Sequence, residues 1–160
     1  MQNRKAILIG RTAQIPMQRG AQLVQDFLEE HGYEREWINT ADERDRKKLN
    51  EVCLNEAAVL ISFDLAGFER STQSGSFLYN ILSCKSIHLV EEKPERFLEV
   101  LKDRKVSIAL FFAGIDMPEG EEKRLCSQLP QVPWLKCCPL QKAELQLLLC
   151  QIFTESFLPL

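Results

Sequence analysis

The stretch from Lys5 to Gly10 reads KAILIG, an apolar run without the alternation of a strand that has one face in water. Such a continuous run is typical of a parallel strand that is covered on both faces. Two similar runs follow, AAVLISF at 57–63 and VSIALFFA at 106–113. Each of these runs predicts a buried strand near the centre of a sheet.

Between these runs, short β-rich stretches alternate with longer stretches of helical periodicity. Residues 18–31 predict the first helix, because their apolar residues form one stripe and Gly32 follows as a helix terminator. Further strands are predicted at 33–39, 86–90 and 132–137, and further helices at 42–56, 75–84, 94–104, 119–129 and 141–157. Pro133 places the sixth strand at an edge, because proline lacks the N–H of a central strand.

A strand followed by a helix, repeated along the chain, predicts right-handed crossovers between parallel strands. We therefore expect a single α/β domain over residues 1–160. Its sheet is expected to be doubly wound and mostly parallel, with five to six strands and helices on both faces, in a Rossmann-like or flavodoxin-like arrangement. The pattern leaves open the strand order and the direction of the sixth strand.

The composition limits the classes of partner. The net charge of −3 and the pI of about 5.5 argue against general affinity for nucleic acid. The apolar run at 6–9 is too short for a signal peptide, and no run approaches the roughly 20 residues that span a bilayer. We expect a cytoplasmic protein without a membrane or nucleic-acid partner. Its six cysteines form no C-x-x-C and it has two histidines, so no metal site is expected.

Ligands of open α/β sheets bind beyond the carboxyl ends of the strands, where the strand order reverses. The loop after the first strand reads GRTAQIPMQRG and matches neither the dinucleotide-binding fingerprint nor a P-loop. Only Gly10 and Gly20, at its two ends, could bring backbone close to a phosphate. Arg11, Thr12 and Arg19 are candidates to hold an anion near a helix N-terminus. The alternative is that these arginines are solvated or pair with nearby carboxylates.

The loop after the third predicted strand reads DLAGFERSTQSGS and is rich in acids, hydroxyls and glycine. Its candidate ligand-binding residues are Asp64, Gly67, Glu69, Ser71, Thr72 and Ser74. Such a loop could bind the hydroxyl groups of a sugar or a nucleotide. The alternative is that Asp64 caps a turn and that Ser74 or Ser76 caps the next helix.

No recognised catalytic set is present. The chain lacks the G-x-S-x-G motif of serine hydrolases, and His88 falls inside a predicted strand, where a core histidine is expected. No cofactor is assigned by any motif.

The run from Ile61 to Glu69, together with Tyr79-Asn80, Cys84-Lys85 and His88-Leu89, carries a resemblance. It is similar to a group of uncharacterised α/β proteins of anaerobic gut bacteria that share an F-D-x-A-G-F-E run. The likeness covers about a third of the chain and implies no activity. It implies that the residues from Asp64 to Glu69 form a site rather than a simple turn.

Three functions compete at this point. The first is a binding or regulatory domain for a small anionic ligand of nucleotide or sugar type. The second is a glycosyltransferase-like enzyme that uses Asp64 or Glu69 as acid or base, and two close carboxylates with a raised pKa on one would favour it. The third is an interaction module that forms a homodimer through the apolar segment Gln141–Leu160.

Overall fold

The computed structural model describes residues 4–52, 57–64, 66, 85–91, 95, 98, 109–113, 119–130, 132, 134–156 and 158–160. In this part of the chain the strands form one sheet in the order β2-β1-β3-β4-β5-β6, and every neighbouring pair is parallel. The strands are β1 (Lys5–Gly10), β2 (Glu34–Asn39), β3 (Val59–Phe63), β4 (Lys85–Val90), β5 (Ala109–Ala113) and β6 (Trp134–Cys138). The predicted α/β class with a parallel sheet is confirmed, and β6 lies at an edge of the sheet.

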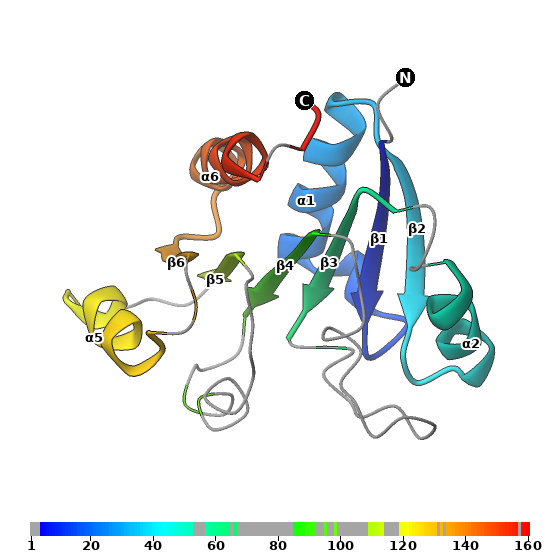
Figure 1. Ribbon diagram of the computed structural model, residues 1–160, viewed down its shortest axis with the longest axis horizontal. Helices are drawn as coiled ribbons and strands as arrows, with labels where there is room; N and C mark the ends of the chain where they lie inside the picture. Colours follow the sequence, from blue (N-terminus) through cyan, green and yellow to red (C-terminus); the bar gives the residue numbers. More distant parts are fainter. Residues whose placement is uncertain are drawn as a thin grey trace.

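The described helices are the 3-10 helix η1 (Ile15–Met17), α1 (Arg19–Glu30), α2 (Glu43–Val52), α5 (Glu121–Gln128) and α6 (Lys142–Glu155). Figure 1 shows α1 and α6 together on one side of the sheet, with α2 and α5 near its opposite edges on the other side. The predicted helix at 75–84, and most of the one at 94–104, lie outside the described residues.

Helix α1 follows the predicted pattern closely. Its apolar stripe is buried, and it consists of Ala21, Leu23, Val24, Phe27 and Leu28. At its C-terminus Gly32 has a φ of 72°, a left-handed conformation that glycine adopts without a Cβ clash. The N–H of Gly32 donates to the Glu29 carbonyl, and the N–H of Tyr33 donates to the Leu28 carbonyl. These two bonds make a Schellman cap that turns the chain into β2.

The main core lies between the sheet and the α1–α6 pair. Phe27 of α1 and Phe153 of α6 meet edge to face, with ring centroids 5.2 Å apart. Alternate residues of the strands face this core, among them Leu8, Ile61 and Leu89. Their neighbours on the other face of the sheet are also fully buried, including Ile7, Ile9, Ile38 and Leu60. Both faces are therefore covered, which explains the continuous apolar runs of β1 and β3.

The apolar character of α6 is largely used within the chain. Leu145, Leu149, Ile152 and Phe153 are buried, whereas Leu147 is 74% exposed. The segment after α6 also packs inward, since the hydroxyl of Tyr33 donates to the Pro159 carbonyl at 2.6 Å. A homodimer through 141–160 stays a prediction. Among the helices that the structure describes, none has the length and apolar character needed to cross a bilayer.

Candidate functional site

The strand order creates a switch point at the carboxyl edge of the sheet. The chain leaves β1 through α1 to reach β2 on one side, and then returns past β1 to β3 on the other side. Connections that diverge from neighbouring parallel strands leave room for a ligand between them. Three segments lie at this edge: the loop after β1, the turn after β3 and the residue after β4.

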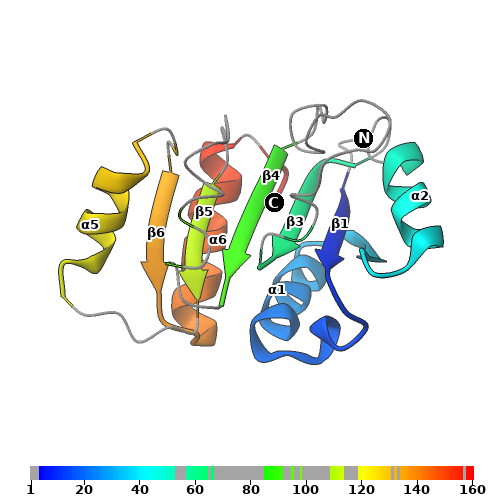
Figure 2. The ribbon, with the colours of Figure 1, turned by 90° about the horizontal axis from the view of Figure 1, so that it is seen from below.

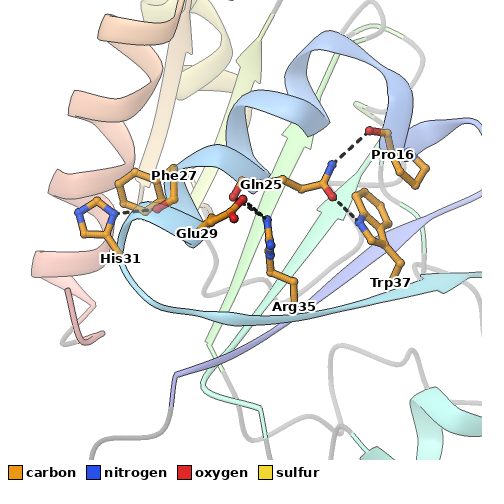
Figure 3. A network of polar contacts seen from close by, with 7 residues as sticks. All are labelled: Pro16, Gln25, Phe27, Glu29, His31, Arg35 and Trp37. Atoms are coloured by element: carbon orange, nitrogen blue, oxygen red, sulfur yellow. Dashed lines mark hydrogen bonds and ion pairs between the residues drawn. The ribbon is translucent and has the colours of Figure 1, made fainter.

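The loop after β1 is folded back on the sheet. A Cβ on Gly10 would lie 2.8 Å from the Cβ of Ile15, so the missing side chain makes room for buried Ile15. Gln25 of α1 holds the same loop, because its Nε2 donates to the Pro16 carbonyl at 3.1 Å (Figure 3). Its Oε1 accepts the Trp37 Nε1–H at 3.0 Å. Gly10 therefore serves packing rather than close approach to a phosphate.

The three candidate anion-binding residues of this loop lie on its outside. Arg11, Thr12 and Arg19 are exposed. Among the described residues, neither arginine forms an ion pair, so the structure does not gather these side chains into an enclosed anion site.

Asp64 joins the ends of two neighbouring strands. Its φ of 50° is left-handed, a conformation in which aspartate is more common than most residues. Its N–H donates to the Leu89 carbonyl at 2.8 Å, and its Oδ1 accepts the N–H of Glu91, also at 2.8 Å. The side chain thus fixes the position of the Glu91 backbone.

Glu91 extends from the end of β4 to the first turn of α1. A Cβ on Gly20 would lie 1.8 Å from Glu91 Oε1, so only glycine leaves space for the carboxylate there. Glu91 Oε1 is buried and has no hydrogen-bond partner within the described part of the chain. Burial raises the pKa of Glu91, the nearby Asp64 carboxylate raises it further, and the Gly20 N–H opposes both effects.

The arrangement favours ligands that donate hydrogen bonds. The N-terminus of α1 attracts negative charge, but it already faces the Glu91 carboxylate, so a ligand phosphate would have to compete with Glu91 there. Carboxylates accept hydrogen bonds from hydroxyl or amine groups. Within the described ranges, no three His, Cys, Asp or Glu side chains are grouped as metal ligands.

His88 lies on the face of the sheet opposite α1 and α6. It is fully buried, and its Nδ1 lies 2.5 Å from the Oγ of Ser62. Burial lowers the pKa of His88 to about 3, so the imidazole is neutral at physiological pH. The prediction of a core histidine is confirmed.

Sequence reasoning placed residues 91–93 at the carboxyl edge of the sheet but did not name Glu91 as a site residue. The available signal was an acid directly after a buried strand, the same signal that singled out Asp64. Gly20 was a candidate for close approach of the backbone to a phosphate, whereas it leaves space for the Glu91 carboxylate. The remaining candidates lie outside the described residues, namely Gly67, Glu69, Ser71, Thr72 and Ser74.

Comparisons of this chain with models of protein families, with curated proteins and with solved structures find no match.

Proposed function

We propose that this protein is a small-ligand-binding or regulatory domain for a nucleotide- or sugar-like molecule. The proposed site lies at the carboxyl edge of the sheet, between β1, β3 and β4. The observation that carries this proposal is the meeting of Asp64, Glu91 and the first turn of α1 at the switch point of the strand order.

The proposal includes a doubly wound sheet of the flavodoxin-like kind. Its support is the strand order β2-β1-β3-β4-β5, which is the flavodoxin-like order, together with helices on both sides of the sheet. In such sheets the ligand site lies at the β1–β3 junction, next to which Asp64 and Glu91 stand.

The chemistry of the edge suggests how a ligand would lie. The Glu91 side chain is only partly buried at this edge, and its carboxylate is an acceptor, which suits a ligand hydroxyl. Arg11 and Arg19 are exposed on the loop and on the first turn of α1, which suits an anionic group at the outer rim. We therefore propose that the hydroxyl-bearing end of the ligand faces Glu91 and that any phosphate faces the arginines.

A second candidate is a glycosyltransferase-like enzyme that acts on a nucleotide or a sugar. The observation that favours it is a pair of neighbouring carboxyl groups, one of which, Glu91, has a raised pKa. A raised pKa is one of the features by which a carboxyl group can act as a general acid or base. Because Asp64 Oδ1 is engaged by backbone, Glu91 would be the acid or base among the described residues.

Two further proposals accompany this function. The first is a relationship to the gut-bacterial α/β proteins, which rests on the run at 63–69, part of which lies outside the described residues. A cytoplasmic location is supported by Cys126, Cys137, Cys138 and Cys150, which are free thiols and fit a reducing compartment.

A thermal-shift screen against nucleotides, nucleotide-sugars and sugar phosphates tests the binding function. A ligand at about a hundred times its dissociation constant stabilises the folded state by about 2.7 kcal/mol, which raises the melting temperature by roughly 5–10 °C. We expect Glu91→Gln to reduce this shift strongly, because the acceptor charge is lost.

Asp64→Asn is a conservative second variant, because asparagine tolerates the left-handed backbone and keeps an acceptor for the Glu91 N–H. It tests the charge of Asp64 without displacing Glu91. Glu34→Gln, at an exposed position of β2, is the matched control and should keep the full shift. A ligand whose shift survives both site variants binds elsewhere, and turnover of a bound nucleotide-sugar that stops in Glu91→Gln would favour the enzyme.

A further inference from the structure

The outer edge of β6 is covered by α5. Figure 2 shows α5 alongside β6, at the end of the sheet beyond which the described chain has no further strand. Leu125 of α5 is fully buried and anchors the helix, and Leu129 and Val132 bury the connection to β6. An edge strand has backbone N–H and C=O groups that point away from the sheet, and these groups can pair with another strand.

Two side chains of α5 bind the outward backbone groups of β6. Glu122 Oε2 accepts the N–H of Cys137 at 2.9 Å. One helical turn later, the Cys126 thiol donates to the Leu135 carbonyl, with Sγ and O 3.8 Å apart. Alternate residues of a strand direct their backbone groups to the same side, so Leu135 and Cys137 share the side away from β5.

Glu122 is itself held in place across the strand. Its Oε1 lies 3.5 Å from the Nζ of Lys136, which is the charged residue of the β6 sequence WLKCC. This ion pair directs the Glu122 carboxylate toward β6. Lys136 is the one charged residue of β6, so an edge without α5 would otherwise consist of apolar and strand-favouring residues, which is the type of edge that associates.

We propose that α5 is a guard of the β6 edge, and that Glu122 is its principal residue, blocking the pairing of β6 with the β6 strand of a second copy of the chain. Antiparallel pairing of two such edges about a twofold axis would satisfy the same N–H and C=O groups that Glu122 and Cys126 now satisfy.

The test compares Glu122→Ala with Glu121→Ala. Glu121 precedes Glu122 in the same helix but pairs with Arg124, so it controls for loss of one negative charge from α5. For Glu122→Ala we expect the Cys137 amide to exchange with solvent roughly tenfold faster, since a charge-assisted hydrogen bond is lost. We also expect a concentration-dependent dimer in sedimentation velocity. Glu121→Ala should keep the sedimentation behaviour of the unsubstituted protein and a protected Cys137 amide.

Two more variants separate edge pairing from general destabilisation. Glu122→Gln keeps an acceptor for the Cys137 N–H, so it should behave like the unsubstituted protein. It provides the comparison if Glu122→Ala folds poorly. Adding Cys137→Pro to Glu122→Ala removes the outward donor and should restore the monomer. Either a monomeric Glu122→Ala with an unchanged Cys137 amide or a dimer that persists after Cys137→Pro would overturn the proposal.

Discussion

Glu91 carries a carboxyl group whose surroundings disfavour its ionised form. Its pKa is raised in the folded protein above the ordinary value of 4.5, chiefly by burial and then by Asp64. The folded state therefore holds this proton more tightly than the unfolded chain does. The contribution of Glu91 to stability is fully present below the unfolded pKa and is lost as the pH rises through the folded pKa.

The residue-scale prediction is that Glu91→Gln removes this loss. Relative to the unsubstituted protein, the variant should gain free energy of unfolding between pH 4 and pH 7, because a neutral amide does not ionise. Urea denaturation at both pH values measures the difference. Glu34 is exposed, and Glu34→Gln should show no comparable gain in the free energy of unfolding. An unchanged pH dependence of stability in Glu91→Gln would contradict a raised pKa of Glu91.

At the scale of elements, Gln25 connects three parts of the fold. It lies on α1, donates to Pro16 in the loop after β1 and accepts from Trp37 on β2. Trp37 in turn stacks on Phe63, the last residue of β3, with ring centroids 5.4 Å apart. The position of the first loop at the proposed site therefore depends on a helix and two strands.

We predict that Gln25→Leu destabilises the protein by about 1–3 kcal/mol, because it leaves the Trp37 N–H and the Pro16 carbonyl without their partner. Tryptophan fluorescence, to which Trp37 and Trp134 both contribute, would report the stability during urea denaturation. Gln22→Leu, on the exposed face of the same helix, is the matched control and should change stability by less than about 0.5 kcal/mol. Equal losses in the two variants would contradict the connecting role of Gln25.

At the scale of the whole molecule, the two ends of the described chain meet at the amino edge of the sheet. Arg4 donates to the His31 carbonyl at 2.7 Å and to the Leu160 carbonyl at 3.0 Å. Tyr33 donates to Pro159, and the Leu158 N–H donates to the Phe153 carbonyl. These contacts fasten the segment after α6 to the start of the sheet.

We expect Tyr33→Phe to lower the free energy of unfolding by about 0.5–1.5 kcal/mol through loss of the Pro159 bond. Hydrogen exchange at the Leu158 amide should become faster, because the segment is released from Tyr33, which directly precedes β2. Ser127→Ala also removes a hydroxyl that bonds a carbonyl, but that bond stays within α5, so this variant should leave Leu158 unaffected. Unchanged exchange at Leu158 in Tyr33→Phe would show that the segment is held by other contacts.

The sequence alone predicted the class of fold, because burial on one or two faces imposes a period on each element. The run at Lys5–Gly10 predicted β1, and the apolar stripe with Gly32 predicted α1 and its end. These signals are local, since each depends on residues within a few turns of one another. Asp64 was also singled out by its place after a buried run.

The tertiary structure alone determined the strand order and the partners of the polar side chains. Asp64, Glu91 and Gly20 are far apart in the chain, and nothing in their local sequence states that Glu91 enters the first turn of α1. The same holds for Glu122, which reads as a surface charge but binds the edge of β6. Local burial sets the elements, whereas the pairing of distant elements depends on how their surfaces pack together.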